Sequence, residues 1–401
     1  MPGVLRVNRP LLQVEEAQAR LLALARPVAR QDLGLAAAAG RWVADDVHAR
    51  RAQPGADLSA MDGYALRFAD MPGPWQVVGE SAAGSPLGRT LAAGQAARIF
   101  TGATMPAGAD TVLVQEEAAR NGKLLQLAGE GPPARGAHVR AMAQDFAQGA
   151  LLMAKGTRLN AARVALAAAA GHAALPVNRL IRIAIIATGN ELQPPGAPLL
   201  PGQLPESNGV MLAALLVDMP VEIVDMGIIA DELPALVAAF QEVEADIIVT
   251  TGGASVGEHD LVRPALEAAG GALDFWRIAL RPGKPLLAGT LGTAVVLGLP
   301  GNPVSAFVTA QLFLRPLIAA FGGADAPLPR TRHARLGAPL AANDRRQNYL
   351  RGFWRDEHVM AAAAQDSAML LTLANADCLI IRPPHAPPAA LGEFVQILDL
   401  A

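Results

Sequence analysis

The sequence predicts a multidomain chain that combines a doubly wound, parallel α/β sheet with smaller β units. The first reason is length, because 401 residues exceed what one hydrophobic core normally organises. The second is an alternation of strand-like and helical runs from Arg182 to residue 321, which is typical of a parallel sheet covered on both faces. The third is a series of short strand-like runs between Gly/Pro turns, in residues 46–139 and again after about residue 325.

Within the alternating part, each expected strand is rich in Ile, Val and Leu, and each expected helix repeats apolar residues at helical spacing. We expect strands over residues 182–188, 221–227, 245–250, 273–280 and 293–300. We expect helices between and after them over residues 208–218, 233–243, 261–270 and 303–321. Two more helices are expected outside this part, over residues 13–26 and, between Asn160 and Gly171 as its caps, over residues 160–171.

The two β units have different expected forms. Residues 46–139 contain runs such as AARIF and KLLQLAG between Gly/Pro turns, which predicts a small β domain. The C-terminal tail holds short strands with polar breaks, such as YLRGFWR and EFVQILDL, which predicts a small β barrel or sandwich.

Composition and charge narrow the function classes. The chain is 52% hydrophobic and 17% charged, as a folded, soluble protein is. Its 33 basic and 36 acidic residues include no basic block, so we expect a small ligand and no nucleic acid partner. The N-terminus lacks a signal-peptide pattern, and the most apolar helical stretch, residues 160–173, is too short to span a bilayer. We therefore expect a cytoplasmic protein without membrane contact.

The cysteine and histidine content argues against a metal site built from cysteines and against one built from histidines. Cys378 is the only cysteine, so an intrachain disulfide and a cysteine metal cage are excluded, in agreement with a reducing compartment. Inside the run DCLII it is expected to be a small buried hydrophobe rather than a nucleophile. The seven histidines are scattered, and His259 is expected to be a surface loop residue.

Three glycine-containing loops follow predicted strands of the parallel sheet: TGNEL (188–192), TGGASVGEHD (251–260) and LPGNP (299–303). Ligands of such sheets bind outside the carboxyl ends of the strands. Glycines there let backbone N–H groups approach an oxyanion, and Asn302–Pro303 suits the start of a helix with free N–H donors. A fourth loop, RPGKP (281–285), adds Arg281 and Lys284, which are both able to pair with phosphate.

Three carboxylates, Glu191, Asp231 and Asp260, stand at strand-to-helix junctions near these loops. Carboxylates beside a phosphate repel it unless a cation intervenes, so they indicate Mg²⁺ bridging protein and ligand. Any one of the loops taken alone fits ordinary turn chemistry, with its acid as a cap or a solvated side chain. The combination of the loops in one sheet favours a phosphate-type site.

Two stretches of the predicted β domain also carry polar side chains at strand ends. SAMDGYA places Asp62 before Gly63, and RIFTGA places Thr101 before Gly102. Taken alone, both are better interpreted as hairpin turns than as active-site loops.

In order along the chain, SAMDGYA, RIFTGA with PAGAD, ATGNEL, TTGGASVGEHD, RPGKP and LPGNPVSA form a specific set. Together they resemble the molybdopterin molybdenumtransferases, the MoeA family that includes the gephyrin E domain. The resemblance covers essentially the whole chain. It implies four parts: an elongated helical region from 1–45 and 140–178, an inserted β domain at 46–139, an α/β molybdopterin-binding domain at 179–324 and a C-terminal β barrel at 325–401.

The resemblance also implies an activity. Family members insert molybdate into molybdopterin carried in its adenylylated form, with Mg²⁺ required and AMP released. They form elongated homodimers in which the β domain of one subunit faces the α/β domain of the other. Molybdopterin adenylyltransferase, and molybdoenzymes or their chaperones, are the expected transient partners.

Site residues carry over by motif. Asp62 and Thr101 would reach the site from across the dimer, and Asp145 lies where the family has a functional acid. The full set of implied catalytic residues is Asp62, Thr101, Asp145, Glu191, Asp231, Asp260 and Lys284, and the implied Mg²⁺ ligands are Glu191, Asp231 and Asp260. The implied pterin-phosphate loops comprise Gly189, Gly252, Gly253, Ser255, Gly257, Arg281, Gly283, Pro300, Gly301, Asn302 and Pro303.

The chain departs from the family pattern at a few positions. Arg281 stands where Lys is usual, Asn190 replaces a frequent Asp, and Asp366 precedes Ser367 where Gly is usual. Glu258 and His259 receive no role. Two alternatives to a molybdate-inserting enzyme stay open: a molybdopterin-binding scaffold with weak or no catalysis, and the same chemistry with tungstate, whose size and charge nearly equal those of molybdate.

Overall fold

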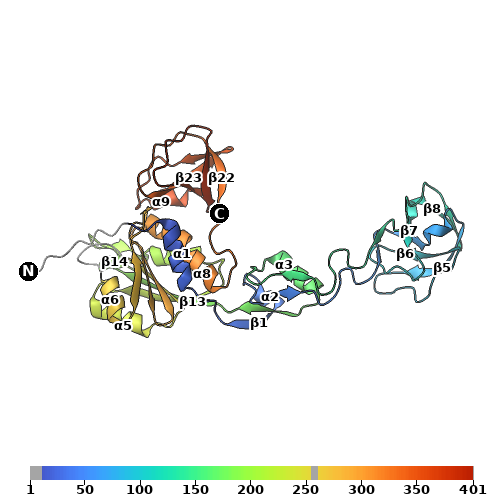
Figure 1. Cartoon of the computed structure of the whole chain (residues 1–401), viewed down its shortest axis with the longest axis horizontal. Helices are drawn as coiled ribbons and strands as arrows, with labels where there is room; N and C mark the ends of the chain where they lie inside the picture. The colour runs from blue at the N-terminus through green and yellow to red at the C-terminus, as the bar shows by residue number, and fades with distance from the viewer. Residues whose placement is uncertain (1–10, 254–260, 401) are drawn as a thin grey trace, which may run out of the picture.

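The structure, a computed structural model, describes residues 11–253 and 261–400. It is elongated (Figure 1). An α/β unit with the C-terminal barrel beside it forms one end, a six-stranded sheet forms the other, and a narrow middle region joins them. The predicted multidomain fold is therefore confirmed.

The α/β unit is built on one six-stranded sheet. Its order is β16 (Val221–Ile229), β13 (Ile181–Thr188), β17 (Ile247–Thr251), β21 (Ala294–Leu299), β20 (Leu287–Leu291) and β18 (Ala272–Trp276). The first four strands are parallel, as predicted. At one edge the sheet continues with antiparallel β20 and β18, so the complete sheet is mixed.

Strand β20 was not predicted, and one glycine explains why. Gly289 lies inside it, and glycine is a weak strand former. In the structure a Cβ on Gly289 would lie 2.4 Å from the carbonyl oxygen of Ala272, so the residue is small because the neighbouring strand is close. In the sequence, Gly289 argues against a strand, whereas in the structure it is needed for the strand to pack against its neighbour.

Helices cover both faces of this sheet (Figure 1). Side chains alternate along β13, with Ile183 and Ile185 in one core and Ile186 in the other. Each fully buried aliphatic side chain contributes about 1.5–3 kcal/mol, so this alternation fixes the register. One face is covered by α4 (Asn208–Leu215), α7 (Pro303–Thr309) and α8 (Arg315–Phe321), and the other by α5 (Leu233–Glu242) and α6 (Val262–Ala268).

The segment Pro303–Phe321 is a single long helix in which η3 (Ala310–Leu314) forms a π-helical turn between α7 and α8. It is the one helix of the described residues that is long and apolar enough to cross a membrane, but 83% of its apolar window is buried inside the protein. Arg315 at its middle donates two hydrogen bonds to Asp218. It is the central helix of a protein core.

The first helix, α1 (Val14–Leu24), packs against this long helix rather than within the middle region. Its buried residues Val14, Ala17 and Leu21 join the same core cluster as the α/β sheet. The side chain of Gln18 donates to the carbonyl of Leu312. The resemblance implies that residues 1–45 belong to one region with residues 140–178. Within 1–45, however, helix α1 packs by its apolar face against the α/β unit.

The middle region consists of narrow two-stranded ladders and two short helices. The chain runs outward and back through it, so each ladder pairs an early segment with a late one. Asn160 caps the start of α3 as predicted, because its side chain accepts a hydrogen bond from Arg163 N. The elements are β1 (Arg30–Gly34) with β12 (Ala174–Asn178), β2 (Val47–His48) with β11 (Leu151–Met153), β3 (Leu58–Ser59) with β10 (Val139–Arg140), α2 (Leu35–Ala38) and α3 (Ala161–Ala169).

The distal sheet confirms the predicted β domain. Gly63, expected in a turn, begins its strand β4, and a Cβ there would lie 2.0 Å from the carbonyl oxygen of Leu113. The strand order is β7 (Thr111–Val114), β4 (Gly63–Leu66), β6 (Gln95–Ile99), β5 (Trp75–Ser81), β9 (Leu124–Leu127) and β8 (Ala118–Asn121), with short helices η1 (Phe68–Asp70) and η2 (Gln115–Glu117).

The C-terminal unit is a closed barrel, one of the two forms expected. Strand β23 pairs with both β24 and β25, which closes a ring of five strands. The short strand β19 (Leu280–Arg281) of the α/β unit adds to β23. The barrel contains β22 (Arg332–Leu336), β23 (Gln347–Arg355), β24 (His358–Ala361), β25 (Cys378–Arg382), β26 (Phe394–Asp399) and the helix α9 (Leu370–Ala374).

We predict that Cys378 is unreactive in the folded chain. It is 0% exposed on β25, as expected of a buried hydrophobe, and burial raises the pKa of its thiol to about 12. Ellman's reagent should therefore label the chain only at the rate at which the barrel opens, and at full rate in denaturant. Rapid labelling of the folded chain at neutral pH would contradict this burial.

Candidate functional site

Three loops meet at the carboxyl edge of the α/β sheet. A Cβ on Gly252 would lie 2.3 Å from the carbonyl oxygen of Thr188, and a Cβ on Gly301 would lie 3.5 Å from the Cα of Gly252. The loops after β13, β17 and β21 are thus in contact, as the sequence predicted. Gly252 and Gly253 have φ of +92° and +58°, which glycine adopts without strain. Gly252 and Gly253 are half-buried and Gly301 is exposed, so the backbone of these loops is partly open to solvent.

A fourth strand end, that of β16, brings Asp231 to the same place. The Asp231 side chain accepts a hydrogen bond from the Thr188 hydroxyl at 3.3 Å, and its N–H donates to the Asn190 side chain at 3.0 Å. Asn190 is the residue that replaces the family's frequent Asp. Because an amide carries no charge, it holds the Asp231 backbone without placing a second negative charge beside that carboxylate.

Glu191 lies in the turn that leaves β13. Its carboxylate folds back over Gly189, where a Cβ would lie 2.7 Å from Oε2. Its carbonyl accepts the N–H of Leu204, which joins β14 (Leu192–Gln193) to β15 (Leu204–Pro205). Glu191 and Asp231 thus belong to loops linked through Thr188 and Asn190. Asp260, Ser255 and Gly257, together with the unassigned Glu258 and His259, lie outside the described residues.

The start of helix α7 offers fewer free donors than predicted. Asn302 is the N-cap and Pro303 the first residue, as expected, but the Asn302 side chain makes no capping hydrogen bond. The next N–H, of Val304, already donates to the carbonyl of Ser367 from the barrel at 3.1 Å. The barrel therefore occupies a donor that the sequence assigned to the ligand.

Asn208 was missed by sequence reasoning. Its side-chain N–H donates to the carbonyl of Gly301 at 2.8 Å, so it fixes the loop before α7 from helix α4. Its Oδ1 is buried and has no hydrogen-bond partner among the described residues. In the sequence, an Asn at the start of a helix is interpreted as a helix cap. Only the hydrogen bond to Gly301 shows that Asn208 holds the loop before α7.

The RPGKP loop packs along helix α7. Gly283 has φ of +108°, and a Cβ there would lie 2.7 Å from Thr309 Cγ2 and 3.6 Å from the carbonyl oxygen of Ser305. The loop therefore runs along the first turns of α7. Arg281 and Lys284 on either side of it are exposed to solvent. The structure thus places this loop, with its two exposed cations, along the helix that begins after the loop of Gly301.

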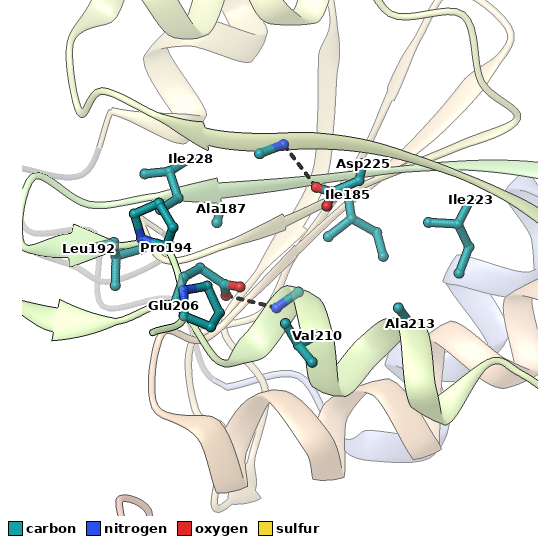
Figure 2. A pocket seen from close by; sticks show the side chains of 13 residues that line it. Ile185, Ala187, Leu192, Pro194, Glu206, Val210, Ala213, Ile223, Asp225 and Ile228 are labelled. Atoms are coloured by element: carbon teal, nitrogen blue, oxygen red, sulfur yellow. Dashed lines mark hydrogen bonds between the residues drawn. The ribbon is translucent and has the colours of Figure 1, made fainter. Parts of the chain in front are cut away.

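An apolar cleft of about 640 Å³ adjoins the loops. Figure 2 shows it between helix α4 and the strands β13 and β16. Its residues Ala187 and Leu192 flank the first loop of the cluster. Two carboxylates, Glu206 and Asp225, line the otherwise mostly apolar walls, and sequence reasoning singled out neither.

Asp62 and Thr101 form a joint unit in the distal sheet. Asp62 Oδ1 accepts hydrogen bonds from the Thr101 backbone N–H at 2.7 Å and from its hydroxyl at 2.8 Å. These two bonds, helped by the nearby Arg98 guanidinium, lower the pKa of Asp62. The carboxylate is therefore held ionised and oriented directly before the start of β4, which is more organisation than a plain hairpin turn needs.

Within one chain this pair does not meet the loop cluster. The sheet that carries it lies at the opposite end of the elongated molecule from β13 (Figure 1). Asp145 lies in the middle region, exposed, with its N–H on the carbonyl of Gln53. The chain thus assembles Glu191, Asp231 and the glycine loops, and leaves Asp62, Thr101 and Asp145 apart from them.

We predict that Gly252→Ala destabilises the chain more than Gly270→Ala does. Both glycines have φ near +90°, so each alanine costs about 1–2 kcal/mol in backbone strain. At Gly252 the new Cβ also meets a carbonyl, whereas at Gly270 nothing lies within 4 Å. An extra loss of about 1–3 kcal/mol for Gly252→Ala is expected in urea unfolding. Equal losses in the two variants would show that the strand ends are not this close.

We also predict that Thr101→Ala raises the pKa of Asp62, because one of its two hydrogen bonds is lost. Thr111→Ala is the matched control, since the Thr111 hydroxyl donates to Asp110 instead. NMR titration of the labelled carboxyl carbons should show each variant moving its own aspartate. An unchanged Asp62 titration in Thr101→Ala would contradict the contact.

Comparison with known proteins gives three family-model matches in succession along the chain. "MoeA N-terminal region (domain I and II)" matches residues 12–171, "Probable molybdopterin binding domain" matches 184–320, and "MoeA C-terminal region (domain IV)" matches 333–400. The matches follow the order of the distal and middle parts, the α/β unit and the barrel.

Full-length relatives and a solved structure agree. A molybdopterin molybdenumtransferase of Nostoc sp. is 36% identical over 91% of this chain and 87% of its own length. One of Haemophilus influenzae is 32% identical over 96% and 98%. The crystal structure of a molybdopterin biosynthesis moeA protein from Pyrococcus horikoshii OT3 matches with TM-score 0.83 and 25% identity, over 97% of this chain and all of that one. By these matches the chain belongs to the MoeA family, the molybdopterin molybdenumtransferases of molybdenum cofactor biosynthesis.

Proposed function

We propose that the chain inserts molybdate into adenylylated molybdopterin in a Mg²⁺-dependent reaction that releases AMP. The observation that carries the proposal is the contact of the loops after β13, β17 and β21, with Asp231 bonded into the first of them. Such a cluster supplies backbone N–H groups for phosphates and carboxylates for a cation in one place.

The phosphates are proposed to lie over the glycine loops. Gly301 is exposed there and Gly252 and Gly253 are half-buried, so the backbone of these loops is partly open to solvent. Lys284 and Arg281 complete the anion site from the RPGKP loop, the lysine as a compact charge and the arginine as a planar fork. These residues would bind and orient the phosphoanhydride before any bond is broken.

The two acids that the structure describes at this site, Glu191 and Asp231, are proposed to bind Mg²⁺ together with phosphate oxygens of the substrate. No three His, Cys, Asp or Glu side chains in residues 11–253 and 261–400 are grouped so that they could hold a metal ion. Mg²⁺, however, commonly takes one or two carboxylates and fills its other positions with waters and phosphate oxygens. Glu191 and Asp231 meet that need, and Asp260 is proposed as a third ligand. Bound there, the ion would neutralise charge on the phosphate that leaves as AMP.

The remaining groups position the reactants. Thr188 and Asn190 hold the Asp231 carboxylate and backbone in place through their hydrogen bonds. Asn208 holds the loop at Gly301. Hydrolysis of the phosphoanhydride, in which a water oxygen bonds to phosphorus as the anhydride P–O bond breaks, releases AMP and leaves the pterin with its own phosphate. This hydrolysis makes insertion irreversible once molybdate has reached the dithiolene sulfurs.

The site is proposed to be completed by a second copy of the chain. Asp62 and Thr101 are organised as an ionised, oriented pair but lie far from the loop cluster of their own chain. A homodimer in which the distal sheet of one subunit faces the α/β unit of the other would bring them there, with Asp145 nearby. The four-part division, a cytoplasmic location and transient contact with the adenylyltransferase and with molybdoenzymes or their chaperones belong to the same proposal.

The experiment that tests the reaction uses the purified chain with adenylylated molybdopterin, Mg²⁺ and either molybdate or tungstate. AMP release and protein-bound metal are followed together. Turnover with molybdate supports the proposal, and preferential turnover with tungstate favours the other oxyanion. Bound substrate without turnover with either oxyanion contradicts catalysis and favours a scaffold.

We predict that Asp231→Asn lowers AMP release by about 10²–10³-fold, the usual effect of removing a group that stabilises charge at the reaction centre. Glu242→Gln is the control, because it removes an equal charge from the last residue of α5, the helix that follows Asp231. Both rates are measured at saturating Mg²⁺. Equal rates of AMP release in the two variants would show that Asp231 does not take part in the reaction.

We predict that two defective variants complement each other in a mixed dimer. Asp62→Asn and Asp231→Asn are co-expressed with different tags, and the heterodimer is isolated. If each site combines residues of two subunits, one of its two sites is intact, and about half of the normal activity returns. If each site lies within one chain, the heterodimer stays as inactive as either parent.

A further inference from the structure

A polar pocket of about 510 Å³ in the distal sheet gathers cations that the proposed reaction leaves without a role. Its floor is β5, which lies between β6 and β9 in the sheet. Three neighbouring elements supply the cations: β6 gives Arg98, the loop between β5 and β6 gives Arg89, and the hairpin of β8 and β9 gives Arg120 and Lys123. Glu80 is the one carboxylate in the lining, so positive charge dominates this basic pocket.

The four cations of the basic pocket make no ion pair with any residue that the structure describes. Other arginines of the same sheet are paired. Arg67 Nε lies 3.9 Å from Asp70 Oδ2. Arg135 Nε lies 2.9 Å from Asp110 Oδ2. Like charges that converge in a concave site repel each other and attract counter-ions strongly, so the basic pocket is suited to a multiply charged anion.

Arg98 is held in a fixed orientation at one side of the basic pocket. Its guanidinium lies over the ring of Phe100, 4.6 Å from the ring centroid, and over that of Tyr64 at 5.3 Å. One terminal nitrogen donates to the carbonyl of Gly63 at 2.8 Å, and the other donates to the Gln115 side chain at 2.7 Å. A guanidinium has more N–H donors than these two bonds use, so an oriented donor is left for a ligand.

The hairpin of β8 and β9 fixes the opposite side of the basic pocket. Arg120 Nε donates to the carbonyl of Gly122 at 2.8 Å, which leaves its two terminal nitrogens without a bond to the described residues. The Lys123 carbonyl accepts the N–H of Val77 at 2.8 Å, so the hairpin turn is attached to β5. Both side chains are exposed to solvent, as is that of Arg89, so an ion can reach them.

We propose that the basic pocket binds a doubly charged tetrahedral oxyanion. Arginine forks and lysine ammonium groups are the side chains that pair with such groups. A single carboxylate would leave most of the positive charge uncompensated, whereas a dianion offers charge and acceptor oxygens in several directions. Val77 and Val78 are the only aliphatic residues in the lining, so little surface is present for a ring or an acyl chain to pack on.

The basic pocket lies next to the Asp62–Thr101 pair. Arg98 bonds the carbonyl of Gly63, which follows Asp62 in the chain. Phe100, under the same guanidinium, directly precedes Thr101. The inference rests here on the proposed function, because a dimer that brings this pair to the loop cluster of the other subunit brings the basic pocket with it. An oxyanion bound there would be concentrated beside the site that consumes it.

Two participants of the proposed reaction carry the required group. Molybdate is itself a tetrahedral dianion, and the released AMP carries a phosphate. They share the oxyanion chemistry, but only AMP also has a ring and a sugar to accommodate. The scarcity of aliphatic lining favours molybdate, and binding measurements with both probes separate the two sources.

The test compares two double variants of the full-length chain. Arg120→Gln with Lys123→Gln removes two exposed charges from the basic pocket. Lys155→Gln with Arg355→Gln is the matched control, because it removes one lysine and one arginine from exposed positions in the middle region and the barrel. Binding of molybdate is measured by equilibrium dialysis and that of AMP by calorimetry. We expect the pocket variant to bind molybdate about 10-fold or more weakly, because charged hydrogen bonds are lost, and the control to bind it as the unmodified chain does.

A crystal of the unmodified chain soaked in tungstate locates the ion by its anomalous scattering. Weakened molybdate binding in the pocket variant, with tungstate between β5 and the hairpin, supports molybdate as the occupant, and weakened AMP binding alone assigns the basic pocket to the nucleotide phosphate. Equal affinities of the two double variants for both probes, or tungstate found only elsewhere, overturn the inference. Failure of the proposed reaction would appear instead as absent AMP release with oxyanion binding in the basic pocket retained.

Discussion

The site depends on how closely two strand ends approach each other. The parallel register of β13, β17 and β21 places their carboxyl ends at one edge, and the loop after β17 then passes directly against the carbonyl of Thr188. Only a residue without Cβ fits at Gly252. The Thr188 side chain also donates its hydroxyl to Asp231, so the same strand end contacts both neighbouring loops. The packing of the proposed site therefore follows from one geometric constraint.

The rest of the chain can be understood from the position of that edge. The barrel contacts it through Ser367 and the strand β19, so the C-terminal unit helps to hold the start of α7 and the RPGKP loop. The distal sheet is separated from it by narrow two-stranded ladders, which pack around a small core of their own that includes Val43, Leu175 and Val177. A chain that carries the oriented Asp62–Thr101 pair at the far end of such an arm needs another subunit to use it in the proposed reaction.

The elements of the α/β unit and its glycine loops were predictable, because buried strands and helices show characteristic patterns of apolar residues in the sequence. Ile183 to Ile186 lie in a strand buried on both faces, and such strands read as continuous apolar runs. The glycine loops were predictable because each directly follows such a run. β20 was not, since Gly289 suppresses its strand signal for a packing reason that only the neighbouring strand reveals.

The polar details of the site were less accessible from sequence. Asn208 and Glu206 act across space, on Gly301 and in the cleft, while their sequence context is that of an ordinary helix start. Asp225 faces the cleft by alternation with Ile223 along β16, but an acidic residue in an otherwise apolar run gives no sign of the cleft beside it. The donor of Val304 was assigned to the ligand because the barrel residue that occupies it is distant in sequence. Local patterns predict elements and loops, whereas the partners of individual polar atoms depend on the tertiary fold.

The measurement that tests the central claim most directly is a crystal structure of the dimer with adenylylated molybdopterin and Mg²⁺. The account predicts the substrate phosphates within hydrogen-bond distance of backbone N–H groups in the loops of Gly252–Gly253 and Gly301, with the ion on Asp231. Phosphates bound elsewhere, with these loops free of ligand, would contradict it.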